Sequence, residues 1–125
     1  MEDFQRDVER FMLAADQPVS RVPEVTGSDQ EELYLNLIKE EYEELVTAMS
    51  EKDIVESADA IADLVWVVIG LASTIGIPFD AVWKEVKRSN DSKTVNGTLV
   101  KNPETGKVMK PDTFSEPDLL PILFP

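Results

Sequence analysis

Hydrophobic residues recur along the first ninety positions of the chain at the spacing of amphipathic helices. Residues 2–15 place apolar side chains at every third or fourth position, which predicts a short first helix. Residues 17–27 contain two prolines and a glycine, and this composition predicts a loop. Ser28 followed by Glu31 is a capping-box pattern, so a second helix is predicted to begin there and to run to about Met49.

A third helix is predicted over residues 54–74, after a short connection at residues 50–53. Its middle, residues 58–72, is apolar on nearly every side, which is typical of the central helix of a bundle. A glycine and a proline then separate it from a fourth helix, predicted from Pro78 to about Arg88 because proline suits a first helical turn. That helix is expected to offer four side chains to the core: Phe79, Val82, Trp83 and Val86.

The helical periodicity disappears beyond Ser89. Residues 98–100 and 107–109 flank a turn-forming segment at residues 102–106, which predicts a small hairpin. The last residues are rich in proline and in apolar side chains, so we expect an extended tail that packs on this subunit or on another. The pattern therefore predicts a single domain over residues 1–125, an all-α bundle of four to five helices with a short irregular or hairpin C-terminal tail.

Charge and composition narrow the classes of function. The chain carries 25 Asp and Glu against 12 Lys and Arg, a net charge of −13, which repels polymeric nucleic acid and anionic membranes. Cysteine and histidine are both absent, which excludes thiolate chemistry and histidine bases and leaves oxygen as the metal ligand. Oxygen ligands favour Mg²⁺, Mn²⁺ or Ca²⁺. No signal sequence or membrane-spanning run is expected, so we predict a soluble cytoplasmic protein.

Carboxylates interrupt the apolar face of the second helix. At 100° per residue, Glu41 falls in the middle of that face, and Glu40 and Glu44 lie at its edge. Glu43 falls on the opposite side and is expected to be solvated. Glutamate-rich helices are usually solvated faces, and for this cluster alone that interpretation would suffice.

A second group of carboxylates follows on the third helix, where Glu56, Asp59 and Asp63 fall within an arc of roughly 60°. Neither aspartate has a Lys or Arg three or four residues away. Two helices joined by a short turn pack antiparallel, so the two acidic groups are expected to face each other. Because buried carboxylates need a partner or a cation, the two groups together favour a metal site.

These residues match a known pattern. Glu40-Glu41-x-x-Glu44, followed by Glu56-x-x-Asp59, resembles the EExxE…ExxD signature of the all-α nucleoside triphosphate pyrophosphohydrolases. This MazG-like superfamily includes phosphoribosyl-ATP pyrophosphohydrolase and the dimeric dUTPases. The family's second motif usually places its Asp directly before the apolar run, a position that Asp63 holds here, so both Asp59 and Asp63 are candidate ligands.

The resemblance extends over most of the chain, from Glu31 to Leu119. Residues 87–93 look like the segment that binds nucleotide after the last core helix of these enzymes. Residues 106–110 and 117–119 look like the tail of the compact members of the superfamily.

The resemblance implies hydrolysis of a (deoxy)nucleoside triphosphate to nucleoside monophosphate and pyrophosphate, as housekeeping of the nucleotide pool. It implies Mg²⁺, with Mn²⁺ as an alternative, because a divalent cation neutralises phosphate charge and activates water. The candidate metal ligands are Glu41, Glu44, Glu56, Asp59 and Asp63. Glu40 and Glu41 are the candidate catalytic residues, with Glu40 placed to orient or deprotonate the attacking water.

Basic and polar residues at the end of the fourth helix and beyond it are candidates for substrate binding. These are Arg88, Asn90, Lys93, Lys107 and Lys110. Lys87 and Arg88 would equally complement the dipole of a helix C-terminus, and the two later lysines would equally belong to a solvated hairpin. Trp66 and Trp83 are expected in the core rather than stacked on a base.

Two other functions compete with the enzyme. One is a non-catalytic acidic helical module that binds a basic partner, and the other is a plain divalent-ion binder. An EF-hand is excluded because its calcium-loop pattern is absent. The apolar third helix and tail also predict a homodimer or homotetramer. No residue indicates the preferred base or sugar.

Overall fold

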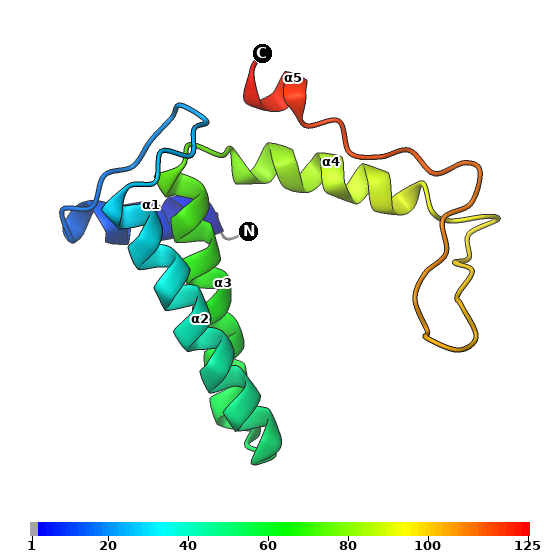
Figure 1. Ribbon diagram of the computed structural model, residues 1–125, viewed down its shortest axis with the longest axis horizontal. Helices are drawn as coiled ribbons and strands as arrows, with labels where there is room; N and C mark the ends of the chain where they lie inside the picture. Colours follow the sequence, from blue (N-terminus) through cyan, green and yellow to red (C-terminus); the bar gives the residue numbers. More distant parts are fainter. Residues whose placement is uncertain (1–2) are drawn as a thin grey trace. The chain divides into compact units, whose positions relative to one another are not determined.

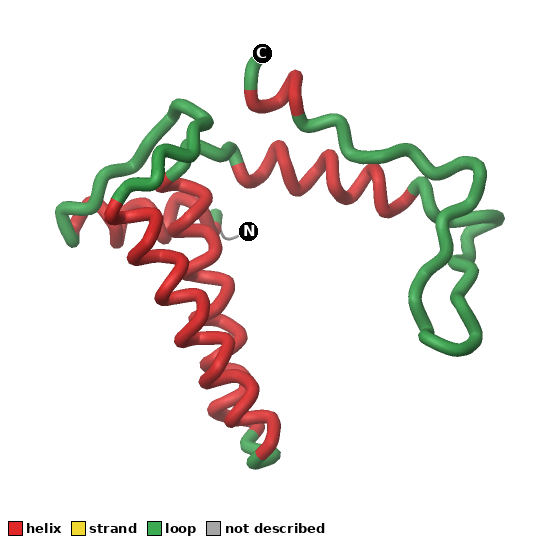
Figure 2. Tube along the Cα trace, viewed as in Figure 1, coloured by secondary structure: helices red, strands yellow, loops and turns green. Residues whose placement is uncertain are grey.

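The computed structural model describes residues 3–125, and within that range it contains helices and no strand (Figure 2). The five helices are α1 (Phe4–Ala14), α2 (Asp29–Ser50), α3 (Ile54–Thr74), α4 (Phe79–Asp91) and α5 (Leu120–Leu123). The predicted all-α class is therefore confirmed. The first predicted helix is also confirmed, apart from Glu2, which lies outside the described residues.

The first three helices begin where a side chain caps the backbone. The Asp3 side chain accepts a hydrogen bond from the Arg6 amide, and the Asp53 side chain accepts one from the Glu56 amide, both at 3.0 Å. Ser28 and Glu31 form the predicted capping box at the start of α2. The predicted bounds of the second and third helices are confirmed. They could be predicted because the capping residues can be identified in the sequence.

The buried carboxylate of Glu31 also binds the end of the preceding loop, in addition to its role in the capping box. It accepts hydrogen bonds from the Thr26 hydroxyl (2.7 Å), the Gly27 amide (3.1 Å) and the Ser28 hydroxyl (3.0 Å). Hydrogen bonds from Thr26 above all lower the pKa of Glu31 to about 2. The junction between the loop and α2 is thus organised around one ionised side chain.

The chain divides into two compact units, one ending at Phe79 and the other running from Asp80 to Pro125. In the first unit, α2 and α3 form an antiparallel hairpin, and α1 packs against α3 (Figure 1). Its core consists of Val8, Met12, Tyr34, Val67 and Ile69. Because α3 contacts both of the other helices in this unit, its predicted central position is confirmed.

One side of this hairpin is left uncovered within the first unit. Along α3, the apolar residues Ile54, Ile61, Val65 and Val68 are exposed. A similar exposed stripe follows α2 at Leu35, Tyr42, Val46 and Met49. An apolar stripe on a helix is typically buried against a further helix, and α1 does not cover these stripes within the first unit.

The loop between α1 and α2 is bound to the end of α3. The Ser20 amide donates to the Ser73 carbonyl at 2.9 Å, and the Glu24 amide donates to the Ile75 carbonyl at 3.0 Å. Gly76, at a φ of 75°, lies so close to the Val22 backbone that a Cβ would clash with it. The loop is therefore irregular in form but fixed in place.

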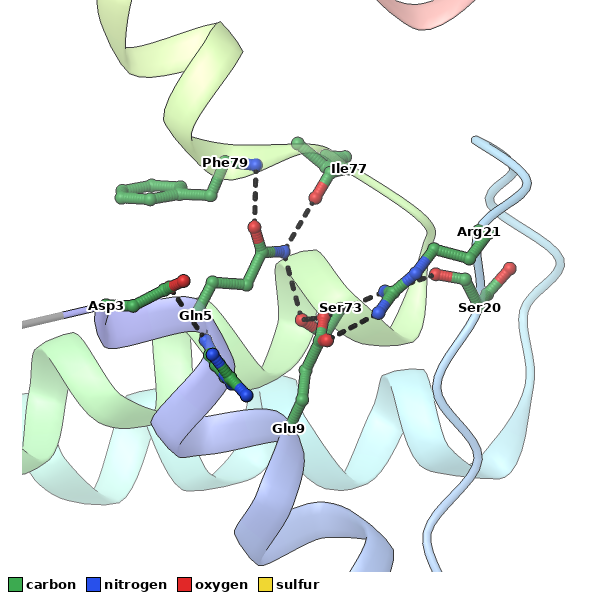
Figure 3. A network of polar contacts seen from close by, with 9 residues as sticks. Asp3, Gln5, Glu9, Ser20, Arg21, Ser73, Ile77 and Phe79 are labelled. Atoms are coloured by element: carbon green, nitrogen blue, oxygen red, sulfur yellow. Dashed lines mark hydrogen bonds and ion pairs between the residues drawn. The ribbon is translucent and has the colours of Figure 1, made fainter.

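A polar network joins α1 to the same end of α3 (Figure 3). Gln5 Nε2 donates to Ser73 Oγ at 3.0 Å and to the Ile77 carbonyl at 2.8 Å. Gln5 Oε1 accepts a hydrogen bond from the Phe79 amide at 3.0 Å. One glutamine side chain thus satisfies three groups around the end of α3.

The fully buried Ser73 extends this network to an ion pair. Its hydroxyl donates to Glu9 Oε2 at 2.6 Å, and Arg21 binds both carboxylate oxygens of Glu9 at 2.6 and 2.9 Å. The hydrogen bonds from Arg21 and then Ser73 lower the pKa of Glu9 against the opposing effect of burial. Glu9 is therefore a half-buried charge with its partners in place.

The second unit contains α4, a hairpin-like segment and the tail. Lys101 and Val108 form an antiparallel bridge, and the Met109 amide donates to the Val100 carbonyl at 2.7 Å. The predicted pairing is present, although it is too short to form a regular strand. The short helix α5 was not predicted.

The expectation that Trp83 is a core residue is wrong, because its side chain is 61% exposed. By helix angle it lies at the margin of the α4 stripe formed by Phe79, Val82 and Val86, on the side of Lys87. Trp66, also expected in the core, is 37% exposed and forms a T-shaped contact with the Phe11 ring. In the part of the chain that is described, no single helix is long and apolar enough to cross a membrane, although α3 and α4 taken together reach that length and hydropathy.

Candidate active site

Four carboxylates interact between the second half of α2 and the first half of α3. Glu41 is half-buried, and its Oε2 atom is fully enclosed with no hydrogen-bond partner among the described residues. The carboxylates of Glu44, Asp59 and Asp63 all act on it electrostatically. The structure therefore joins the two acidic groups that the sequence predicted to face each other.

The electrostatics of this cluster oppose ionisation. Burial, followed by contact with Glu44 and the charges of Asp63 and Asp59, raises the pKa of Glu41 to about 7. Burial also raises the pKa of half-buried Asp63, with further contributions from Asp59 and Glu44. Carboxylates held together in this way lack the positive charge that would stabilise them.

The cluster fits a divalent cation in the kind of its ligands. It offers only carboxylate oxygens, which Mg²⁺ and Mn²⁺ prefer, and it includes one buried oxygen that no protein group satisfies. Among residues 3–125, no three carboxylates lie close enough together to form a ready-made metal site. The carboxylate ligands and the unpaired oxygen of Glu41 are therefore compatible with a divalent cation. A complete set of ligands is not preformed among the described residues.

Two of the predicted acidic site residues are not part of this interacting group. Glu40 and Glu56 are exposed, as Glu44 and Asp59 are, but neither is among the carboxylates that act on Glu41 or Asp63. Glu43 is exposed, as its position on the opposite side of the helix predicted. The structure thus brings together Glu41 and Glu44 with Asp59 and Asp63.

Arg88, predicted to bind substrate, is used within the second unit. Its guanidinium binds both carboxylate oxygens of Glu85 at 2.7 and 2.8 Å and donates to the Glu116 carbonyl at 2.9 Å. Glu85 also accepts a hydrogen bond from the Asp118 amide at 2.6 Å. These bonds, above all those from Arg88, lower the pKa of Glu85 to about 2. The pair therefore fixes the tail against α4.

Three other predicted substrate residues lie together, around a residue that the sequence analysis missed. Lys93 donates to Asn90 Oδ1 at 3.1 Å, and its Nζ lies 5.6 Å from the centroid of the Phe114 ring. Lys110 Nζ lies 5.0 Å from the same centroid. Lys107 is exposed and apart from this ring. No local sequence signal links Phe114 to a lysine 21 positions earlier, whereas the spacing of Glu85 and Arg88 is a helical i,i+3 pair that could have been identified.

An open cavity lies elsewhere, near the start of α2 and the end of α3. It measures about 500 Å³ and is lined mainly by residues 18–33 and Thr74. Some of its polar lining groups already bond to one another, as Gln30 Nε2 does to the Pro18 carbonyl (2.7 Å) and to Thr74 Oγ1 (3.1 Å). This side chain of the lining is therefore already satisfied within the protein, unlike the enclosed oxygen of Glu41.

Comparison with known families identifies the chain. The family model of phosphoribosyl-ATP pyrophosphohydrolase matches residues 8–90, which include the whole carboxylate cluster and most of α4. Among curated proteins, none matches the chain. The matched segment covers well over half of the sequence. The chain therefore belongs to the phosphoribosyl-ATP pyrophosphohydrolase family, within the MazG-like superfamily, whose members are pyrophosphohydrolases of nucleotide triphosphates.

Proposed function

We propose that this enzyme is a Mg²⁺-dependent hydrolase that converts a (deoxy)nucleoside triphosphate to the monophosphate and pyrophosphate, as housekeeping of the nucleotide pool. The observation that carries the proposal is the enclosed Oε2 atom of Glu41, which has no protein partner among the described residues and is surrounded by further carboxylates. An ionised carboxylate in this position destabilises the protein alone, and a bound cation would stabilise it by supplying the missing positive charge.

Glu41, Glu44, Asp59 and Asp63 would hold Mg²⁺, or Mn²⁺ in its place, and Glu56 lies one helical turn before Asp59. When bound, the ion neutralises phosphate charge and makes bound water more acidic. Glu40, exposed beside Glu41, is positioned in the sequence to orient the attacking water or to accept its proton. Because the chain has no histidine, a carboxylate is the base available near neutral pH.

Binding of the substrate is assigned to the second unit. Asn90, Lys93, Lys107 and Lys110 provide polar and positive groups for the nucleotide. Arg88 was predicted to contact the substrate, but its charge is paired with Glu85. We therefore propose that Arg88 positions the tail, which carries Phe114, through its bond to the Glu116 carbonyl.

The decisive experiment measures pyrophosphate release from a panel of canonical and modified triphosphates that includes phosphoribosyl-ATP. Each substrate is tested with Mg²⁺, with Mn²⁺ and with a chelator. We expect turnover of at least one triphosphate that the chelator abolishes and that Glu41→Gln or Asp59→Asn reduces by at least a hundredfold. Glu43→Gln, which neutralises an exposed neighbour, should keep the wild-type rate.

The outcomes separate the alternatives. Turnover that is insensitive to the chelator would contradict the role of the metal. The absence of turnover on every substrate, together with tight binding to a basic protein, would favour the non-catalytic module.

The bare stripes of the hairpin support a homodimer or homotetramer as the working form. The exposed apolar residues on α2 and α3 recur at helical spacing, so each stripe forms a continuous surface that a second copy would cover.

A further inference from the structure

The net charge of the chain is distributed unevenly between its two units. The segment Asp80–Pro125 contains seven Lys and Arg and seven Asp and Glu, so it is neutral overall. The whole excess of negative charge, −13, therefore lies before residue 80. A phosphate-bearing ligand is therefore repelled less by the second unit than by the first, unless a metal ion first neutralises the carboxylates of the first.

Within the second unit, the basic residues fall into two sets. Lys84, Lys87 and Arg88 on α4 are paired with Asp80, Asp91 and Glu85, respectively. Among the described residues, the four later lysines form no ion pair: Lys93, Lys101, Lys107 and Lys110. The charge available to a ligand is therefore concentrated after α4.

Two of these four lysines share one aromatic ring. The Nζ atoms of Lys93 and Lys110 lie 5.6 and 5.0 Å from the centroid of Phe114. Each ammonium group is attracted to the face of the ring, yet the two ammonium groups also repel each other. Because the ring holds two ammonium groups near each other, an anion with several negative charges that binds between them would reduce their mutual repulsion.

Hydrogen bonds on the tail fix the position of this ring. Directly after Phe114, the Ser115 amide donates to Ser92 Oγ at 2.8 Å, and Thr113 Oγ1 donates to the Ser92 carbonyl at 3.2 Å. One residue further on, the Glu116 carbonyl accepts the bond from Arg88. The tail is held on both sides of Phe114, so the ring is placed by the backbone rather than by the lysines.

We infer that Lys93, Lys110 and Phe114 form a binding site for a chain of phosphate groups, one that works without a metal ion. The two ammonium groups would contact phosphate oxygens, and Phe114 would act as a positioning residue that keeps them together. The inference rests on the proposed function in that the phosphate chain would be part of the triphosphate substrate or the pyrophosphate product.

The test is calorimetric titration of inorganic tripolyphosphate into the full-length protein in the presence of EDTA. Without a divalent ion the carboxylates of the first unit repel the probe, so binding reports on the lysines. We expect saturable binding that weakens about tenfold in Lys93→Gln and in Lys110→Gln. Lys101→Gln removes the same charge from the same unit away from Phe114, and it should change the affinity less than twofold.

Phe114→Leu keeps both lysines and tests the ring itself. We expect it to weaken tripolyphosphate binding at least threefold while the thermal unfolding midpoint stays within a few degrees of wild type. Equal losses in the Lys101 and Lys110 variants would show diffuse attraction and would overturn the inference, as would the absence of binding to the wild type.

Further titrations with pyrophosphate and with a nucleoside monophosphate distinguish the source of the phosphates. Tighter binding of pyrophosphate supports the site as one for a phosphate chain, and tighter binding of the monophosphate contradicts it. In the Mg²⁺ assay, Lys110→Gln should raise KM with little change in kcat. Turnover without binding of tripolyphosphate in EDTA would refute this site alone, whereas binding without turnover of any triphosphate would refute only the proposed function.

Discussion

The ring of Tyr34 on α2 occupies the space beside Gly70 on α3 that a Cβ atom would otherwise fill. A Cβ built on Gly70 would lie 2.7 Å from Cζ of the tyrosine and closer still to Cε1. Tyr34 is buried, and its hydroxyl donates to Gln17 Oε1 at 2.6 Å. This close approach allows α2 and α3 to pack tightly within the core, and the hydrogen bond to Gln17 ties the α1–α2 loop to the hairpin.

Gly70→Ala distinguishes packing from helix propensity. Propensity alone predicts that alanine stabilises the middle of a helix by about 0.5–1 kcal/mol. Because the tyrosine ring is in the way, we expect a net loss of about 1–3 kcal/mol in the free energy of unfolding, measured by chemical denaturation. Adding Tyr34→Leu should recover part of that loss, and a more stable Gly70→Ala protein would contradict the packing.

Ser73→Ala tests the polar network of Figure 3. The substitution leaves Glu9 without its buried hydroxyl donor and Gln5 without one of its acceptors. We expect a loss of about 1–3 kcal/mol in the free energy of unfolding. Ser50→Ala, at the exposed end of α2, should cost less than about 1 kcal/mol, and similar costs at the two sites would argue against the network.

Glu31 predicts the response of the protein to acid. Its pKa of about 2 lies below the ordinary value of 4.5, so the folded state holds its proton less tightly than the unfolded chain does. Glu31 therefore stabilises the fold above pH 4.5, and this contribution is lost as the pH falls toward 2. Unfolding measured between pH 5 and 2.5 should show a shallower acid dependence in Glu31→Gln than in the wild type. Glu32→Gln, at an exposed neighbour, should follow the wild-type curve.

Magnesium should stabilise the wild type through Glu41. A ligand at a hundred times its dissociation constant adds about 2.7 kcal/mol to the stability of the state that binds it. We expect Mg²⁺ to raise the unfolding temperature of the wild type and of Glu43→Gln, and to have little effect on Glu41→Gln. In EDTA, Glu41→Gln should be at least as stable as the wild type, because it removes a charge that has no partner. An equal shift by Mg²⁺ in all three proteins would place the ion elsewhere.

The exposed stripe on α3 predicts the oligomeric state. Light scattering at micromolar concentration should give a mass of two or four chains of 14.0 kDa each. Val65→Glu places a charge in the middle of the stripe and should shift the protein toward the monomer. Val100→Glu, an equally exposed position in the hairpin segment, should not. A monomeric wild type would contradict the predicted assembly.

Local chemistry explains which features could be predicted from the sequence. Ser28 and Asp53 cap their helices with their own side chains, so the starts of α2 and α3 follow from neighbouring residues. The meeting of Glu41 with Asp63 follows from helical periodicity and a three-residue connection, which together leave little choice of register. Both are short-range rules applied to long, regular elements.

The features that were missed or wrong depend on contacts between distant parts of the chain. Arg88 is engaged by a carbonyl 28 residues later, and Phe114 collects lysines from two separate segments. Trp83 was assigned to the core together with Phe79, Val82 and Val86, although helix angle places it at the edge of the stripe that those residues form. The need for glycine at position 70 becomes visible only when the tyrosine on the other helix is in place.

The uneven packing of the α2–α3 hairpin sets a gradient of local stability along its length. Its end near α1 is filled by large side chains such as Met12 and Ile69, whereas beyond Glu41 the buried residues are the small Ala48, Ser57 and Ala60. Backbone amides should therefore exchange with solvent slowly near Tyr34 and quickly near the turn at Glu51. The carboxylate cluster lies at the boundary between these regions, so a bound cation would link α2 to α3 and stabilise the less stable half. Slower amide exchange in that half would reveal cation binding before any substrate is added.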